Sequence, residues 1–135
     1  MSTNISSYFV EELINWNHAL NFYCNEIDEL TDKLVSWSKN CQDAQKCEVQ
    51  ENLDSLRKIA ARFSKLQVEM FGHERLLQPS DGSLLSNSMI REKDVTSQDV
   101  LRLNVQAAEK EFVEVKFRCY QLMASLLIKQ FPVNE

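Results

Sequence analysis

The chain contains very few of the residues that interrupt helices. Of its 135 residues, two are glycine and two are proline, and three of these four lie between Gly72 and Gly82. Signals that punctuate strands and tight turns are therefore rare elsewhere. With a hydrophobic fraction of 44%, this length favours one globular domain over residues 1–135. We expect that domain to be all-α.

Long apolar runs are missing too. No stretch of about 18 apolar residues, the length that spans a bilayer, occurs in the sequence. The segment from Met1 to Val10 lacks a basic region followed by an apolar one, so it does not resemble a secretory signal. The net charge of −5 opposes binding to nucleic acid or to an anionic membrane. We expect a cytoplasmic protein with no membrane and no nucleic-acid partner.

Signatures of catalytic sites are also missing. The sequence has two histidines, no glycine-rich phosphate loop and no G-x-S-x-G motif. It also lacks the Glu-x-x-His pairs that hold di-iron centres in helical bundles. Glu69 and His73 are one helical turn apart, and we interpret them as a polar pair near the end of a helix. We therefore expect no catalytic residues, no cofactor and no enzymatic activity.

The four cysteines do not have the spacing of a metal site. No CxxC pair occurs, and no histidine lies near Cys41 or Cys47 in the sequence. We predict that all four are reduced structural thiols that bind no metal; a disulfide or a soft-metal site is the alternative. The cysteines are Cys24, Cys41, Cys47 and Cys119.

The chain does contain a regular repeat of large residues over positions 13–41. The repeat alternates steps of three and four, which is typical of a long helix packed nearly parallel or antiparallel to its neighbours. One heptad position holds Leu13, Leu20, Ile27, Leu34 and Cys41, and the other holds Trp16, Tyr23, Leu30 and Trp37.

The heptad phase changes between Ser38 and Glu48, where the chain is polar. This change predicts a reversal near residues 40–43, which separates a helix over about 8–39 from one over about 44–77. The reversal would bring Trp16 level with residues near 68, so that Leu66 is its closest heptad neighbour on the second helix. One uninterrupted helix of about 70 residues, dimerising along its length, is the alternative. The second seam comprises Val49, Leu56, Phe63, Met70 and Leu77, with Ile59 and Leu66.

A long loop over residues 78–96 is expected to follow, because Pro79 ends the second helix. Ser6 or Ser7 and Thr96 or Ser97 are the expected N-caps of the first and third helices. The third helix, over about 97–131, completes an elongated antiparallel up-down-up bundle with coiled-coil-like heptad packing. Its seam residues are Leu101, Val105, Ala108, Phe112, Val115, Cys119, Leu122 and Leu126.

The last part of the third helix is apolar nearly all round. Because such a helix is normally buried on several sides, we expect a second copy of the chain to cover its outer residues and form a homodimer. Two residues of the first helix could extend this patch. The predicted interface residues are Phe22, Val35, Phe117, Tyr120, Met123, Leu127, Ile128 and Phe131.

These patterns favour a non-catalytic interaction or structural module that self-associates and presents a further surface to a protein partner. A bundle that binds a small ligand or a metal is the first alternative. The second is a nucleic-acid-binding protein that uses a basic cluster on the second helix, although acidic residues bracket this cluster. The cluster consists of Arg57, Lys58, Arg62 and Lys65.

Overall fold

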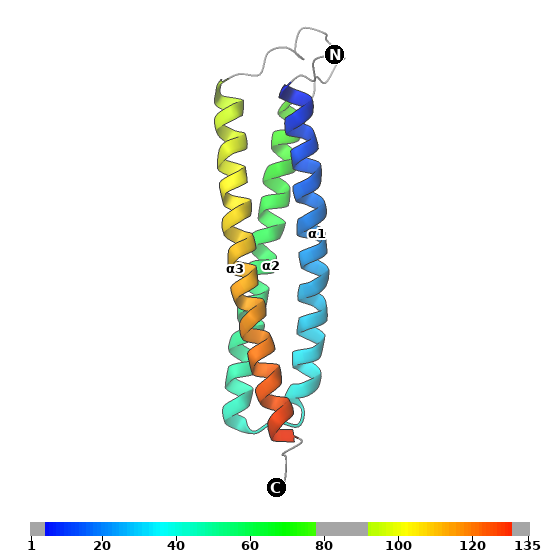
Figure 1. The fold of residues 1–135 in the computed structure, drawn as a ribbon, viewed down its shortest axis with the longest axis vertical. Coiled ribbons are helices and arrows are strands. Elements are labelled where there is room, and N and C mark those ends of the chain that lie inside the picture. Colours follow the sequence, from blue (N-terminus) through cyan, green and yellow to red (C-terminus); the bar gives the residue numbers. More distant parts are fainter. Residues whose placement is uncertain (1–4, 78–91, 131–135) are drawn as a thin grey trace.

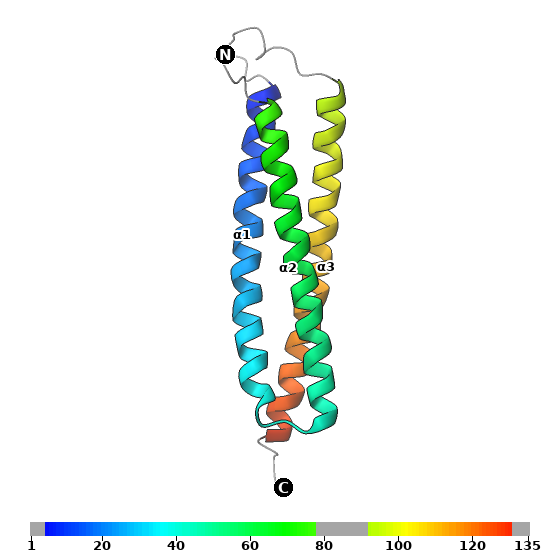
Figure 2. The same cartoon turned by 180° about the vertical axis from the view of Figure 1, so that it is seen from behind.

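The structure, a computed structural model, describes residues 5–77 and 92–130. In this part of the chain, three long helices form an antiparallel bundle (Figures 1 and 2): α1 (Ile5–Ser38), α2 (Asp43–Leu77) and α3 (Glu92–Gln130). The helices have 34 to 39 residues and are therefore about 50 to 60 Å long. The predicted all-α, up-down-up three-helix bundle is confirmed.

α1 and α2 reverse where the change of heptad phase predicts, between Ser38 and Asp43. The backbone N–H of Gln42 donates to Oε1 of Gln45 at 3.0 Å, which is one half of a capping box at the start of α2. The alternative of one continuous helix is wrong. We call this the turn end of the bundle, and we call the opposite end, where α2 finishes at Leu77, the Leu77 end.

The predicted start of the third helix is wrong, because α3 begins at Glu92 rather than near residue 97. Thr96 lies within the helix and donates through Oγ1 to the carbonyl oxygen of Glu92 at 3.1 Å. Glu92 and Asp94 in the first turn complement the helix dipole. The apolar spacing did not predict the first turns of α3, because the polar residues Asp94 and Gln98 fill the buried positions there.

The predicted cap of the first helix is wrong as well. Both candidates, Ser6 and Ser7, lie within α1, which the structure describes from Ile5 onward. Ser6 is buried, and its Oγ donates to the carbonyl oxygen of Leu77 at 3.0 Å. Because the last carbonyls of a helix have no partner within it, Ser6 caps the end of α2 instead of the start of its own helix.

The core is built from the predicted seams of all three helices. At mid-height, one aromatic ring from each helix meets the other two: Tyr23, Phe63 and Phe112 have ring centroids 5.2 to 5.8 Å apart. Trp16, Tyr23 and Trp37 are partly buried and pack against this core. Among the described residues, the fully covered side chains include Leu13, Leu20, Leu34, Leu56, Ile59, Phe63, Val105, Phe112, Cys119 and Leu126.

α2 packs closely on both neighbours, whereas α1 and α3 contact each other less. The side of α3 that faces α1 carries one residue per heptad, and three of these are polar and pair with α1. They are Arg102 with Glu12, Glu109 with Tyr23, and Lys116 with Glu26.

Met123 is the next residue in this heptad series, and it is buried. Toward the turn end, the ribbon of α3 approaches that of α1 (Figure 1), and Met123 belongs to the buried core. The prediction that Met123 belongs to an exposed interface is therefore wrong.

Candidate interaction surface

The outward side of α3 carries a second regular row of mostly apolar side chains in its C-terminal half. The row advances by four, three, four and three residues, which is the spacing of a heptad seam. We call it the outer seam: Val113, Phe117, Tyr120, Ala124 and Leu127.

The residues of the outer seam are exposed although the helix already supplies a full seam to the core. Val113 and Phe117 are 62% and 61% exposed, and Tyr120 and Leu127 are 47% and 46% exposed. Ala124 is exposed as well. A helix that is apolar on two opposite faces is typical of one with partners on both sides.

Lys116 connects the outer seam to α1. Its Nζ lies 5.8 Å from the centre of the Phe112 ring and 6.0 Å from that of Tyr120, within the range of a cation–π contact. The same amino group binds a carboxylate oxygen of Glu26, and this hydrogen bond raises the pKa of Lys116. Lys116 is thus held in place as a charged group beside Tyr120.

Most of the predicted interface residues are exposed, but they do not form one patch. Phe22, Val35, Phe117, Tyr120, Leu127 and Ile128 are between 44% and 68% exposed. Phe131 has the spacing of the next residue in the outer seam and lies outside the described residues. Val113 and Ala124 complete the heptad spacing of the outer seam and are not among the predicted interface residues.

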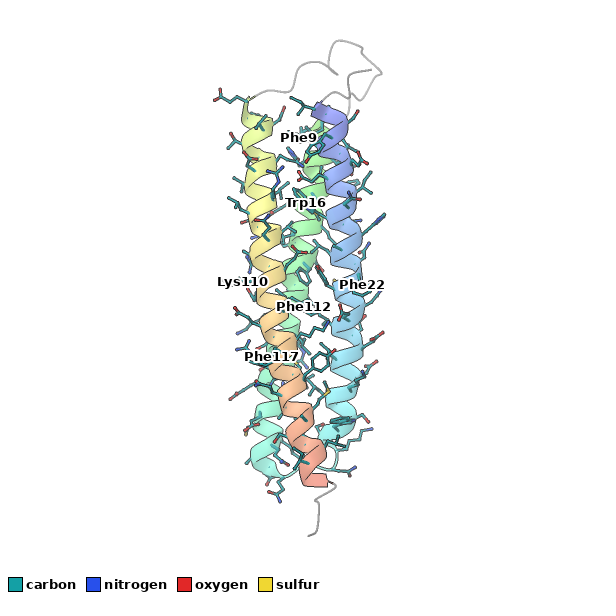
Figure 3. All side chains as sticks on the ribbon, viewed as in Figure 1. Phe9, Trp16, Phe22, Lys110, Phe112 and Phe117 are labelled. Carbon is teal, nitrogen blue, oxygen red and sulfur yellow. The ribbon has the colours of Figure 1, made fainter. Side chains whose placement is uncertain are left out.

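The two predicted residues of α1 lie apart from the outer seam. Val35 shares its heptad position with Asn21, whose side chain accepts a hydrogen bond from Gln67 of α2 at 2.7 Å. Val35 therefore lies on the side of α1 that is turned toward α2. Phe22 and Phe117 appear on opposite flanks of the view in Figure 3. The candidate surface is thus confined to α3.

A buried polar layer lies at the Leu77 end. Nε2 of His73 is 2.8 Å from Oε1 of Gln98, and Nε2 of Gln98 donates to the carbonyl oxygen of Phe9 at 3.3 Å and to Glu12 at 2.8 Å. Glu69 is exposed, and the hydrogen bond of His73 is made with Gln98 rather than with the predicted Glu69. His73 instead pairs with a residue of a different helix, and the layer joins all three helices.

Glu12 and Arg102 complete this layer at its edge. Nη2 and Nε of Arg102 donate to the two carboxylate oxygens of Glu12 at 2.6 and 2.9 Å. Burial opposes ionisation of Glu12, but hydrogen bonds from Arg102 and Gln98 outweigh it and lower the pKa of the carboxyl group. Arg102 also lies over the ring of Trp16 at 5.8 Å. These groups satisfy one another, so the layer has the character of a structural element.

The cysteines do not form a chemical site. All four are free thiols. Burial raises the pKa of Cys119 to about 11, and burial is also the main cause of the raised pKa of Cys24. These two thiols remain protonated near neutral pH and are therefore poor nucleophiles. Within residues 5–77 and 92–130, no group of three or more potential metal ligands comes together.

Two of the four basic residues in the cluster on α2 form ion pairs with carboxylates. Nη1 of Arg57 is 3.1 Å from a carboxylate oxygen of Asp54, and Arg62 pairs with Glu111 of α3. The remaining members, Lys58 and Lys65, are exposed. Two of the four charges are thus balanced by neighbouring carboxylates, which weakens the attraction of this face for phosphate groups.

A hollow of about 400 Å³ is lined by α1 alone, at Tyr8, Glu11, Glu12, Asn15 and Trp16. The candidate ligand site that lies between two helices is a groove of α1 and α2. Its volume is about 220 Å³, below the range of about 300 to 1,000 Å³ that is usual for ligand pockets. Gln67, on its wall, is already bonded to Asn17 and Asn21. The groove is lined by Leu13, Ile14, Asn17, His18, Gln67, Met70, Phe71 and Glu74.

Two further findings bear on the assignment of a function. Among the helices of the described residues, none is both long and apolar enough to cross a membrane. Comparison with protein-family models, with curated proteins and with solved structures gave no match. A function must therefore be inferred from the side chains of this chain.

Proposed function

We propose that the protein is a non-catalytic helical interaction module that self-associates through the outer seam of α3. The observation that carries this proposal is the heptad spacing of five exposed residues on a helix whose opposite face is already buried. Apolar residues scattered over a surface need no explanation, whereas a row with helical packing periodicity favours a helix as the partner.

A second copy of the chain is the simplest partner, because it requires no further complementary surface. The same seam can meet itself across a two-fold axis, and two-fold dimers are the commonest soluble oligomers. The outer seam also presents no charge of its own. Lys116, whose Nζ lies 6.0 Å from the centre of the Tyr120 ring, is already balanced by Glu26. Two copies can therefore approach without burying an unpaired charge, which would be costly.

The exposed area indicates how strong this association is. Phe117 and Tyr120 expose about half of side chains that bury roughly 150 to 250 Å² each when covered, so the two rings contribute on the order of 200 Å². With Val113, Leu127 and Ile128, the apolar surface is roughly 400 Å² per copy. Including a polar rim, the dimer buries roughly 1,000 to 1,200 Å² in total, the lower end for specific interfaces. We therefore expect a reversible dimer.

The double variant Phe117→Glu/Leu127→Glu tests the proposal. Two glutamates per copy would be buried without partners in the dimer, so the variant should be monomeric. Both positions are exposed within one copy, so its helix content should stay unchanged. Sedimentation over a range of concentrations measures the mass, and circular dichroism measures the helix content.

The matched control is Val100→Glu/Leu103→Glu. These residues are 51% and 64% exposed and lie on the outward side of the same helix, nearer the Leu77 end. The control introduces the same charges outside the outer seam and should dimerise like the wild type. A wild type that stays monomeric at the highest concentrations would contradict self-association, and a dimer that survives the Phe117/Leu127 double variant would contradict the choice of surface.

A further inference from the structure

We infer that the two copies pair in antiparallel orientation, with Tyr120 of each packed on Ala124 of the other. The inference rests on the proposed function and adds the geometry of the complex. Its starting point is the uneven size of the residues in the outer seam. Ala124, the only small one, lies between Tyr120 and Leu127, both of which are large and exposed.

In a parallel pair, these residues of uneven size would pack poorly. In a parallel pair each residue of the seam meets its own copy, so Ala124 would face Ala124 between two layers of large side chains. The gap would leave its lining without partner atoms, and such voids weaken packing. In the layers on either side of this gap, Tyr120 would be crowded against Tyr120 and Leu127 against Leu127.

An antiparallel pair places large residues opposite small ones. Phe117 and Ala124 are one heptad apart, and so are Tyr120 and Leu127. One alignment therefore brings Ala124 opposite Tyr120 of the second copy and, at the same time, Phe117 opposite Leu127. Alternation of large and small residues across an interface is what close packing requires.

The charges beside the outer seam favour the same orientation. In a parallel pair, the flanking positions that meet are five residues apart, which brings Glu109 of one copy near Glu114 of the other, twice per dimer. Glu109 accepts a hydrogen bond from Tyr23 of α1 and keeps its negative charge in doing so. Like charges placed opposite each other oppose association. In the antiparallel alignment Glu109 lies beyond the overlap and Glu114 faces Ile128 at the exposed rim, so the two glutamates do not meet.

The orientation sets the length of the dimer. In the antiparallel alignment the two-fold axis lies level with residue 122, and each α3 extends about 45 Å from it to Glu92. The helical part of the dimer is then about 90 Å long. A parallel pair lies side by side over its whole length and would be about 60 Å long. Only the C-terminal halves of the two bundles overlap in the antiparallel form.

Small-angle X-ray scattering of the wild-type chain, at a concentration where sedimentation gives the dimer, distinguishes the two lengths. A maximum dimension about 30 Å greater than that of the monomeric Phe117→Glu/Leu127→Glu variant supports the antiparallel pair. A dimer no longer than this monomer overturns the inference and leaves the proposed function intact. A monomeric wild type overturns both.

Ala124→Leu provides an independent test in solution. In the antiparallel pair the added side chain collides with Tyr120 of the second copy, so the dissociation constant should rise about tenfold or more. In a parallel pair the two leucines would fill the gap and lower the dissociation constant. Ala107→Leu, an exposed position of the same helix outside the outer seam, is the control and should leave the dissociation constant unchanged. A tighter dimer for Ala124→Leu contradicts the antiparallel pair.

Discussion

The two ends of the bundle are built on different principles. At the turn end the buried residues are mostly apolar, among them Leu34, Val49 and Leu126. The buried polar side chain of Gln45 bonds there to the backbone at the start of its own helix rather than to another helix. At the Leu77 end, Ser6, His73 and Gln98 are buried and hydrogen-bonded across helices. Because buried polar groups need specific partners, we expect the Leu77 end to favour one alignment of the three helices. The apolar turn end contributes mainly stability.

The same contrast explains where the candidate surface lies. Near the Leu77 end, Arg102 uses its side chain to join α3 to α1, and the outward residues of α3 are mixed. Toward the turn end, the buried Met123 takes the corresponding heptad position, and the outward side becomes apolar as well. The C-terminal half of α3 is therefore apolar on two faces. One face packs in the core of the bundle, and the other is the exposed outer seam.

The largest effect is expected in the apolar turn end. Leu126 is 1% exposed, so Leu126→Ala removes three carbons from a packed core and leaves a cavity. The free energy of unfolding should fall by about 2 to 5 kcal/mol, measured by urea denaturation. Leu103→Ala, the same substitution at an exposed position of α3 outside the outer seam, is the control and should change it by less than about 0.5 kcal/mol. Equal effects of the two variants would contradict the placement of α3.

The sequence predicted the parts of this fold that depend on periodicity. The seams, the reversal after Ser38 and the number of helices all follow from apolar residues at steps of three and four. The early start of α3 did not, because Asp94 and Gln98 occupy core positions with polar side chains. The partner of His73 was missed for the same reason, since a pair between helices depends on where α3 begins.

The candidate surface was predicted only in part. Phe117, Tyr120 and Leu127 were identified because they lie off the first seam. Met123 was wrongly included, because the sequence alone does not reveal which flank of α3 faces α1. Ala124 was left out because a small residue adds little apolar area, although its position completes the heptad spacing of the outer seam.

The next largest effect is expected in the buried polar layer. Gln98→Ala removes the partner of His73 and the donor to Glu12, and it leaves His73 buried without that hydrogen bond. The free energy of unfolding should fall by about 1 to 3 kcal/mol. Gln106→Ala, an exposed glutamine of the same helix, is the matched control in the same denaturation experiment and should have little effect.

The double variant His73→Leu/Gln98→Leu tests how much the polar layer stabilises the Leu77 end. It replaces both partners by apolar residues, so the loss should be smaller than that of Gln98→Ala, because no unpaired histidine remains. The polar layer would then fix the alignment of the three helices more than it raises the free energy of unfolding. A loss equal to or larger than that of the single variant would contradict this division of roles.

A smaller effect is expected where the two halves meet. The hydroxyl of Tyr23 donates to Oε2 of Glu109 at 2.6 Å, and this bond, with burial, raises the pKa of Tyr23 to about 12. A raised pKa means that the stabilisation is present below the ordinary tyrosine value of about 10 and is lost as the pH rises through 12. Tyr23→Phe should cost about 0.5 to 1.5 kcal/mol. The difference between the absorbance titrations of the wild type and this variant should show one tyrosine ionising near 12.

The smallest effect is expected in acid, and it concerns the Leu77 end alone. The pKa of Glu12 is lowered when the protein is folded, despite burial, by hydrogen bonds from Arg102 and Gln98. The stabilisation is therefore present above the ordinary glutamate pKa of about 4.3 and is lost as the pH falls through the lowered value. Glu12→Gln should remove this contribution, so its free energy of unfolding should depend less steeply on pH in that window. Glu29→Gln, an exposed position of the same helix, should keep the slope of the wild type. Identical slopes for Glu12→Gln and the wild type would show that the pair of Glu12 and Arg102 does not stabilise this end of the bundle.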